Sequence, residues 1–358
     1  MIVIFFIFYQ SLVSAFEYKN KFSEEIEKIR VRNQLPGIAV VFAEHGKVVV
    51  EEAFGVRKIN AHDLVTKSDK WHLGSCTKSL TAVLIAKLID QKKLDWDFKI
   101  ASLLSKDATL DREMAELTVQ MLLGHRGGLK KDFDGELRSQ IVRDIMATKP
   151  GYALNTEEAY SNSGFVVLGW AAEKVTGLSW EALVQQEIFK PLNMTGCGFG
   201  SPADKDKIFA PDQPWGHKIF TDAVKPAWED NHKVLAPAGT IHCGMKDWYK
   251  FATVLQDGYL ERSSFLKKAS FTNLFSKPPH SASNRINTYF TLARVENSNT
   301  ELQFFAANGS NTSNLARIML FPKQDKILLI ATNAVSQLEN DPANKALTEI
   351  YKLLIPKN

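Results

Sequence analysis

Segments rich in β-branched and aromatic residues occur near both ends of this 358-residue chain, and a long helical pattern separates them. Such segments are typical of strands. The expected strands span residues 37–43, 47–54, 287–295, 302–307, 315–321 and 327–332. This order predicts an α/β (α+β) fold in which one antiparallel sheet contains both ends of the chain and is flanked by helices. We expect the α/β lobe at about residues 16–74 and 256–358, with an all-helical lobe inserted at about 75–255 and a ligand cleft between them.

A serine and a lysine stand three residues apart where the most apolar helix pattern begins, just before Leu80–Ile89. On a helix Ser75 and Lys78 are neighbours, with about 5–6 Å between their β-carbons. A serine hydroxyl is a weak nucleophile until a nearby base takes its proton. Burial lowers the pKa of a lysine from about 10.4 and frees its amine for that task. The pair therefore indicates nucleophilic catalysis, and the alternative is an N-cap serine beside an ion-paired lysine.

The same spacing occurs again at Ser264 and Lys267, in a polar segment with Lys268 behind it. We interpret this second pair as part of a solvated helix surface, because no apolar run follows that could bury the lysine.

The first fifteen residues, Met1 to Ala15, carry no charged side chain and end in the small-residue pattern Val13-Ser14-Ala15. As a helix they would span about 22 Å, which is shorter than the roughly 30 Å hydrocarbon core of a membrane. We expect a cleaved secretory signal peptide at residues 1–15 and no stable membrane span. The mature domain, residues 16–358, is then periplasmic or secreted.

The charge and the cysteine content argue against a nucleic-acid-binding protein and against a disulfide scaffold or zinc site. The 44 basic and 40 acidic residues give a net charge of only +4, and no basic cluster is interleaved with aromatics, so we expect no nucleic-acid partner. The three cysteines form no C-x-x-C pair and cannot all pair with one another. Cys76 is expected in the core, and a bridge between Cys197 and Cys243 stays open.

No metal or cofactor is expected. The histidines at 125, 217 and 242 lack H-E-x-x-H or any paired spacing, so we interpret them as structural loop residues. The chain also lacks a G-x-S-x-G elbow, which argues against an α/β-hydrolase triad.

Several motifs together resemble those of the serine β-lactamase and penicillin-binding-protein superfamily, in its class C β-lactamase and esterase-like branch. That group pairs S-x-x-K with Y-x-N and a K-T-G or H-x-G strand. Ser75-Cys76-Thr77-Lys78 is similar to the first motif and Tyr160-Ser161-Asn162 to the second. Further similar segments follow in the family's order, at residues 117–129, 173–177, 188–195 and 237–240. The resemblance covers about Glu24 to Leu354 and implies a β-lactamase/transpeptidase-like fold.

The resemblance also implies roles for residues. Ser75 would be the acylated nucleophile and Lys78 its proton acceptor or electrostatic partner. Tyr160 would pass the proton to the leaving group or take one from the deacylating water. Asn162 would hold Lys78 or a substrate amide, although a loop-capping asparagine is the plainer interpretation. The oxyanion hole would use the backbone N–H groups of Ser75 and Ser310.

The third motif departs from the family pattern. Asn308, Gly309 and Ser310 fall where the substrate-binding strand belongs, and Gly309 keeps the glycine that lets this strand approach the acyl group. Ala307, however, stands in place of the lysine or histidine. That cation would help to bind a substrate carboxylate, so we consider Arg317 or another basic residue nearby as a compensating cation.

The sequence thus predicts a serine hydrolase that forms a Ser75 acyl-enzyme on small esters, D-amino-acid peptides or amides, or β-lactams. The alternative is a catalytically weak penicillin-binding-like protein that binds or senses a cell-wall fragment. Ala307 favours the alternative, whereas Ser75, Lys78 and Tyr160 together favour the enzyme.

Overall fold

The structure, a computed structural model, describes residues 21–130, 132–276, 286–288, 292–296, 303–336 and 338–355. The predicted signal peptide, residues 1–15, lies outside the described residues, and it stays a prediction.

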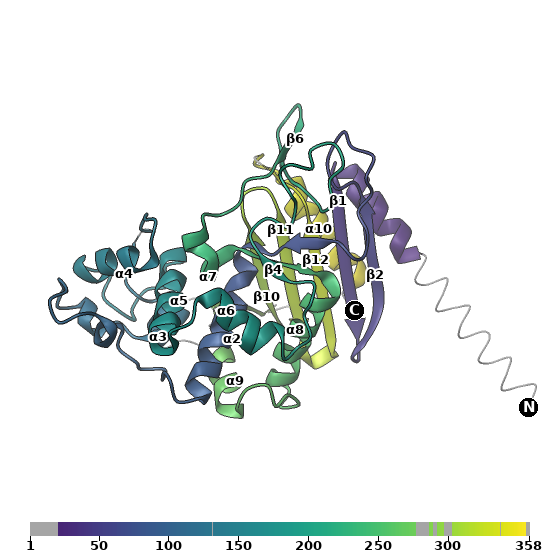
Figure 1. Cartoon of the computed structure of the whole chain (residues 1–358). Helices are drawn as coiled ribbons and strands as arrows, with labels where there is room; N and C mark the ends of the chain where they lie inside the picture. The colour runs from purple at the N-terminus through teal and green to yellow at the C-terminus, as the bar shows by residue number, and fades with distance from the viewer. Residues whose placement is uncertain are drawn as a thin grey trace, which may run out of the picture.

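A seven-stranded antiparallel sheet organises the described part of the chain, in the order β2-β1-β12-β11-β10-β9-β8. Its strands are β1 (Gly37–Glu44), β2 (Lys47–Gly55), β8 (Ile286–Thr288), β9 (Ala293–Glu296), β10 (Gln303–Ser310), β11 (Leu315–Phe321) and β12 (Lys326–Thr332). β1 pairs with β12, so that Ile38 lies opposite Thr332 and Glu44 opposite Lys326. Figure 1 shows the purple N-terminal strands beside the yellow C-terminal strands. The prediction of one antiparallel sheet built from both ends is confirmed.

The central strands are mostly apolar because both faces of the sheet are covered. Successive side chains of a strand point to opposite faces. In β1, Val41 contributes to the large core beneath the helical lobe, and its neighbour Val40 contributes to a second core on the opposite face. That second core is covered by the helix of residues 21–32 and by α10 (Pro342–Leu354).

Helices on the other face connect the sheet to the helical lobe. α8 (Met245–Tyr259) contacts β1, β11 and β12, and α9 (Lys268–Phe275) contacts α8 and α2 (Thr77–Asp90). α2 also contacts the helical lobe, which lies to the left in Figure 1. The lobe and its connections contain α3 (Val119–Leu123), α4 (Arg138–Ala147), α5 (Asn162–Thr176), α6 (Trp180–Val184), a π-helical turn (Gln185–Phe189) and α7 (Ala236–Gly239). Short 3₁₀ turns span Gly74–Cys76, Ile100–Leu103, Met114–Glu116, Lys233–Leu235 and Pro322–Gln324.

Two small sheets complete the fold. One has the order β3-β7-β4 and the other β13-β5-β6. Their strands are β3 (Lys70–His72), β4 (Gly198–Phe199), β5 (Gly216–Ile219), β6 (Val224–Ala227), β7 (Ile241–Gly244) and β13 (Val335–Ser336). A disulfide joins Cys197 to Cys243, where β4 pairs with β7, and this closes the question that the sequence left open.

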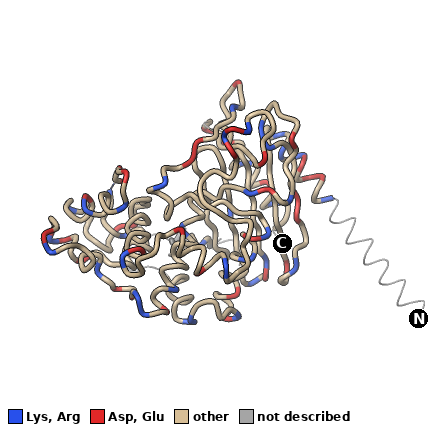
Figure 2. The backbone as a smooth tube through the Cα atoms, in the orientation of Figure 1, with Lys and Arg blue, Asp and Glu red and all other residues tan. Residues whose placement is uncertain are grey.

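The surface of the described residues carries both kinds of charge, and the second S-x-x-K pair differs in one respect from its prediction. Basic and acidic segments are interspersed over both lobes in Figure 2. Ser264 and Lys267 are exposed as predicted, but the prediction of a helix there is wrong, because α9 begins only at Lys268. Within the described residues, no helix has both the length and the apolarity to cross a membrane.

A buried ion pair fixes the approach to β3. The Asp69 carboxylate is fully buried and accepts hydrogen bonds from Arg57 Nε at 2.8 Å and Nη2 at 2.6 Å. It also accepts from the Thr66 N–H at 3.1 Å and from Thr66 Oγ1 at 2.8 Å. Every oxygen of this carboxylate is therefore satisfied just before the strand that leads to Ser75.

Replacing Asp69 by alanine should lower the free energy of unfolding by about 3–5 kcal/mol, because the Arg57 guanidinium would be left without its partner. Urea denaturation measures the change. The matched control is Asp222→Ala, which removes an exposed aspartate and should change the free energy of unfolding by less than about 0.5 kcal/mol. An equal, small effect of both substitutions would contradict the assignment.

Candidate active site

Ser75 lies at the junction between β3 and α2, in the 3₁₀ turn Gly74–Cys76. Between Trp71 and Leu80, all residues except Ser75 are buried, and Ser75 is partly exposed. The turn is held from both sides: the Leu73 N–H donates to the Ile241 carbonyl at 2.8 Å, and the Gly74 N–H donates to His72 Nδ1 at 3.0 Å. A fixed backbone thus presents one reactive side chain to solvent.

Two glycines allow β10 to lie directly against this turn. A β-carbon at Gly309 would come within 1.9 Å of the Leu73 carbonyl oxygen and 2.8 Å of the Ser75 nitrogen. A β-carbon at Gly74, where φ is +49°, would come within 2.3 Å of the Ser310 nitrogen. Any larger residue would force these backbones apart. The contact brings the Ser75 and Ser310 segments together, as an oxyanion hole formed by their N–H groups requires.

The Lys78 amine is buried beside Ser75. Its side chain comes from the first turn of α2, and the residue is only 5% exposed. Nζ lies 3.2 Å from Ser75 Oγ, 2.8 Å from Asn162 Oδ1 and 2.8 Å from the Ala238 carbonyl oxygen. Burial lowers the pKa of Lys78 from 10.5 to about 7, although the Asp132 carboxylate acts to raise it.

These three contacts fix the orientation of the amine relative to Ser75. A charged lysine has three N–H donors and no acceptor. Once Lys78 loses a proton, its two remaining hydrogens can be donated to Asn162 Oδ1 and the Ala238 carbonyl, and the lone pair then faces Ser75 Oγ. A pKa near 7 makes this form accessible at neutral pH.

Tyr160 approaches Ser75 from the loop before α5. Its hydroxyl donates to Ser75 Oγ at 2.7 Å, although the residue as a whole is 60% exposed. Burial of the hydroxyl end raises the pKa of Tyr160 above 10, despite the opposing hydrogen bond to Ser75. The phenol therefore remains protonated at neutral pH. Its ring lies 4.8 Å from Lys78 Nζ and packs on His125 at a centroid distance of 4.7 Å.

Asp132 fixes the start of α5. It accepts hydrogen bonds from Ser161 Oγ, from Asn162 Nδ2 and from the Ser163 N–H, each at 2.9 Å. Burial acts to raise the pKa of this carboxyl, but these hydrogen bonds outweigh it and lower the pKa. With its nitrogen bound to Asp132, Asn162 turns its oxygen towards Lys78. Of the roles considered for Asn162, the structure shows the contact with Lys78.

A second polar cluster lies behind the Ser75 turn. Asp230 Oδ1 is 2.9 Å from His72 Nε2 and accepts from Asn311 Nδ2 at 3.0 Å. Because His72 Nδ1 accepts from the Gly74 N–H, Nε2 is the nitrogen that faces Asp230 with a proton. The cluster ties the residue before Ser75 to the residue after Ser310, and so braces both sides of the backbone contact.

The third motif is only partly in the site. Gly309 and Ser310 reach the Ser75 turn, whereas the Asn308 side chain accepts a hydrogen bond from Arg317 Nε at 2.7 Å. Arg317 also donates to Asn344 and Thr348 of α10, on the opposite face of the sheet. The suggestion that Arg317 supplies the missing cation is therefore wrong, since alternation along β11 directs it away from Ser75.

The remaining residues considered in the sequence analysis, Cys76 and three histidines, are buried or half-buried in the fold. Cys76 is fully buried, and burial raises the pKa of its thiol to about 12, so it is an unreactive core residue, as predicted. Burial lowers the pKa of His125 to about 3 and the pKa values of His217 and His242 to about 4. Over the described ranges, no group of three or more His, Cys, Asp and Glu side chains is arranged to hold a metal.

Sequence reasoning missed Asp132, Asp230 and the Ala238 carbonyl. Asp132 precedes Tyr160 in a polar loop that carries no motif, and a backbone carbonyl leaves no sequence signal. The segment Pro237–Thr240 was noted as similar to the family, but its contact with Lys78 is visible only in the fold.

Known proteins resemble this chain over most of its length. The family model described as Beta-lactamase matches residues 22–348. The chain belongs to the β-lactamase family. It is 27% identical over 243 residues to penicillin-binding protein 4 of Amycolatopsis lactamdurans, covering 66% of this chain and 63% of that protein. It is 26% identical over 251 residues to unguisins hydrolase ungD' of Aspergillus campestris (strain IBT 28561), covering 65% of this chain and 46% of that protein. The chain thus spans about half to two thirds of these relatives.

Solved structures share the fold of this β-lactamase-family chain. A D-stereospecific amidohydrolase from Streptomyces sp. superposes with a TM-score of 0.73 at 17% identity, covering 94% of this chain and 98% of the other. EstCE1, described as a hydrolase with promiscuous acyltransferase activity, has a TM-score of 0.78 at 14% identity, covering 96% and 99%. The membership in the serine β-lactamase and penicillin-binding-protein superfamily that the motifs suggested is confirmed.

The rate of Ser75 acylation by p-nitrophenyl acetate should rise with pH through a midpoint near 7, where Lys78 becomes neutral. The rate should then stay level through the pH range in which a solvent-exposed tyrosine would titrate, because burial raises the pKa of Tyr160. Asp132→Asn removes the charge that raises the Lys78 pKa, and so should move the midpoint to lower pH. Stopped-flow measurement of p-nitrophenol release gives both profiles. A rate independent of pH between 5 and 9 would contradict the role of Lys78 as base.

Proposed function

We propose that this protein is a serine hydrolase that forms an acyl-enzyme on Ser75 and transfers the acyl group to water. The observation that carries the proposal is the convergence on Ser75 Oγ of a buried amine at 3.2 Å and a protonated phenol at 2.7 Å. Nucleophile and base within hydrogen-bond reach, with the base oriented by further groups, form the arrangement that covalent catalysis needs.

In the proposed mechanism, Ser75 Oγ attacks the substrate carbonyl while its proton passes to neutral Lys78. The N–H groups of Ser75 and Ser310 stabilise the oxyanion. Tyr160 gives its proton to the leaving alcohol or amine, and the proton on Lys78 restores the phenol. Water then attacks the acyl-enzyme, with the same groups taking its proton and returning one to Ser75 Oγ. The cycle returns both catalytic groups to their starting state.

The preferred substrates are small esters and amides of D-amino-acid peptides, ahead of β-lactams. Ala307 supplies no cation for a substrate carboxylate, and Arg317 is held by Asn308 and α10. A hydrogen bond to a charged group contributes roughly 1.5–3 kcal/mol, which a neutral substrate does not need. The names of the amidohydrolase and EstCE1 are consistent with such acyl-transfer chemistry.

The proposed location is the periplasm or the exterior of the cell. The uncharged, apolar residues 1–15 support it, as does the Cys197–Cys243 disulfide, because disulfides persist mainly in oxidising compartments.

A second candidate function follows from Ala307: a protein that becomes acylated or binds a cell-wall fragment without efficient turnover. Purified protein is incubated with p-nitrophenyl butyrate and with a chromogenic β-lactam, and its intact mass is then measured. The enzyme predicts multiple turnovers that Ser75→Ala lowers by at least about a thousandfold. A stable adduct without turnover, absent in Ser75→Ala, identifies the second candidate, and turnover unaffected by Ser75→Ala would exclude both.

Substituting Ala307 by lysine or histidine should raise kcat/KM for substrates that bear a carboxylate, by roughly tenfold or more, and should leave neutral esters nearly unchanged. Ala307 is on the same face of β10 as Gly309, and its carbonyl lies 3.7 Å from Cys76 Sγ. The added cation would therefore stand near Ser75. The comparison of a matched pair of substrates, one carboxylate and one methyl ester, measures the effect. Equal changes for both substrates would refute it.

A further inference from the structure

A cavity of about 440 Å³ lies within the helical lobe, apart from the Ser75 contacts. This volume is within the range of roughly 300–1,000 Å³ that small-molecule sites occupy. Its walls come from residues 128–130, from Phe133, from the end of α4 with the loop after it, and from Met114. The lining residues are Met114, Gly128, Leu129, Lys130, Phe133, Ile145, Thr148, Lys149, Pro150 and Gly151.

The two loops that form the cavity are closely joined. The Gly151 N–H donates to the Gly128 carbonyl at 2.8 Å. Gly128 has φ +69°, and a β-carbon there would come within 2.7 Å of Pro150. A β-carbon at Gly151 would come within 2.5 Å of Lys130 Cβ, so the stem of Lys130 lies directly on the opposite loop. The cavity is thus part of the packed structure.

The lining is apolar apart from Thr148 and two lysines. Met114, Leu129 and Ile145 are almost completely buried, whereas Lys130 and Lys149 are exposed. None of the residues that line the cavity is acidic. Lys149 lies 3.7 Å from Glu113, outside the cavity, with both side chains largely in solvent.

The backbone carbonyls at the end of α4 are already occupied by hydrogen bonds within the protein. The Asp144 carbonyl accepts from Thr148 Oγ1 at 2.6 Å, the Ile145 carbonyl from the Thr148 N–H at 3.1 Å, and the Met146 carbonyl from the Asp111 N–H at 2.8 Å. The lining supplies two lysine ammonium groups as cationic donors for the head of a ligand, and of these Lys149 also lies 3.7 Å from Glu113 at the surface.

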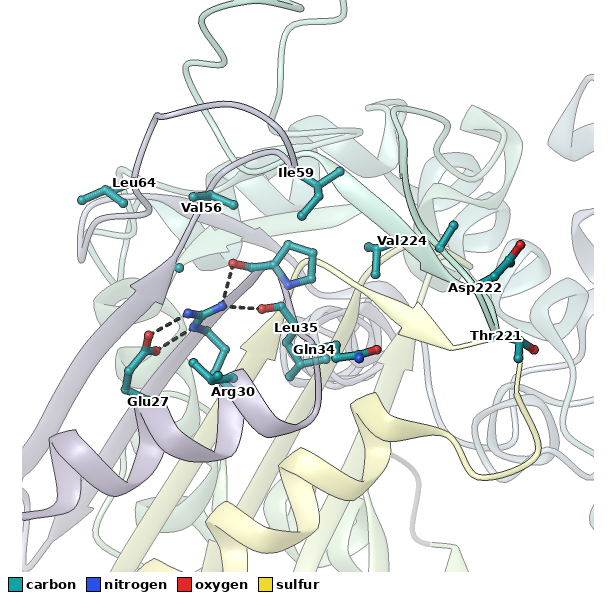
Figure 3. A pocket seen from close by; sticks show the side chains of 14 residues that line it. Glu27, Arg30, Gln34, Leu35, Val56, Ile59, Leu64, Thr221, Asp222 and Val224 are labelled. Atoms are coloured by element: carbon teal, nitrogen blue, oxygen red, sulfur yellow. Dashed lines mark hydrogen bonds and ion pairs between the residues drawn. The ribbon is translucent and has the colours of Figure 1, made fainter.

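A second hollow of the molecule does not combine an apolar interior with an uncommitted cation. It has a volume of about 620 Å³ and lies between residues 27–36, residues 55–64 and the loop at 221–224. Figure 3 shows that Arg30 in it is already engaged by Glu27 and by the carbonyls of Leu35 and Pro36. Its guanidinium is therefore committed to the fold, and no free cation is matched to an apolar interior there.

We propose that the helical-lobe cavity binds an aliphatic monocarboxylate, with its chain among Leu129, Phe133 and Ile145 and its carboxylate at Lys130 and Lys149. The lining matches both parts of such a molecule: an apolar interior for the chain and cations for the head group. The proposal does not depend on the catalytic activity of Ser75.

The site adjoins the catalytic network through one segment. Leu129, Lys130 and Phe133 flank Asp132, which holds Asn162 and, through it, Lys78. The Phe133 N–H also donates to Ser163 Oγ at 2.8 Å, in the first turn of α5. A ligand in the cavity therefore contacts the segment that positions Asp132.

The test is calorimetric titration of the full chain carrying Ser75→Ala, so that nothing is turned over. Octanoate should bind saturably, and shorter carboxylates more weakly by about fourfold for each methylene removed. Octan-1-ol and octylamine, which lack the negative charge, should bind more weakly than octanoate. Absence of saturable binding, or octylamine binding as tightly as octanoate, would overturn the proposal.

Variants locate the binding in the cavity. Lys130→Met with Lys149→Met should weaken octanoate roughly three- to tenfold and leave octan-1-ol unaffected. The matched control, Lys106→Met, removes an exposed lysine of the same lobe and should change neither. Ile145→Phe, which fills the cavity, should weaken octanoate and octan-1-ol alike. If octanoate binds the double-lysine variant as tightly as the parent, the carboxylate is not held by these residues and the assignment fails, whether or not Ile145→Phe folds.

Discussion

The arrangement depends on burying one amine, that of Lys78. Its pKa falls from 10.5 to about 7 because the fold removes water from around it. Each pKa unit corresponds to about 1.36 kcal/mol, so burying this lysine costs on the order of 5 kcal/mol at or below pH 7. The cost disappears as the pH rises towards 10.5, because the unfolded chain then also holds a neutral amine. The fold thereby holds an amine that becomes neutral near pH 7.

Everything that contacts Lys78 serves the same end. Asn162 and the Ala238 carbonyl take two of its hydrogens, and Ser75 takes the third direction. These partners come from different parts of the fold: the 3₁₀ turn Gly74–Cys76, the start of α5 and α7. Asp132 fixes Asn162. The Lys78 amine is thus oriented by packing between segments that are distant in the sequence, and Ser75 is the partly exposed residue among its partners.

The third motif keeps only one of its two roles in this chain. In the family pattern that this chain resembles, the strand of the third motif supplies both a close backbone approach and a cation. Here Gly309 keeps the close approach to the Ser75 turn, but Ala307 supplies no charge. The acyl-transfer geometry and the recognition of a substrate carboxylate are separable in this fold. Their separation is the physical basis for expecting neutral acyl compounds as substrates.

Local patterns in the sequence determined much of this protein. Apolar runs indicated the strands of the large sheet, because a strand buried on both faces needs apolar side chains at every position. The spacing of Ser75 and Lys78 placed them side by side, because helix geometry alone fixes neighbours three residues apart. The flanks of Tyr160 identified the third group through the family resemblance.

The tertiary structure decided what depends on contacts between distant residues. It paired Cys197 with Cys243, turned Arg317 towards α10, placed Ser264 outside any helix and brought Asp132 and the Ala238 carbonyl to the site. None of these has a periodic or local signal, since each follows from how separate segments pack. The sequence identified Ser75, Lys78 and Tyr160 as the candidate groups, and the packing of distant segments determined the distances between them and the pKa of Lys78.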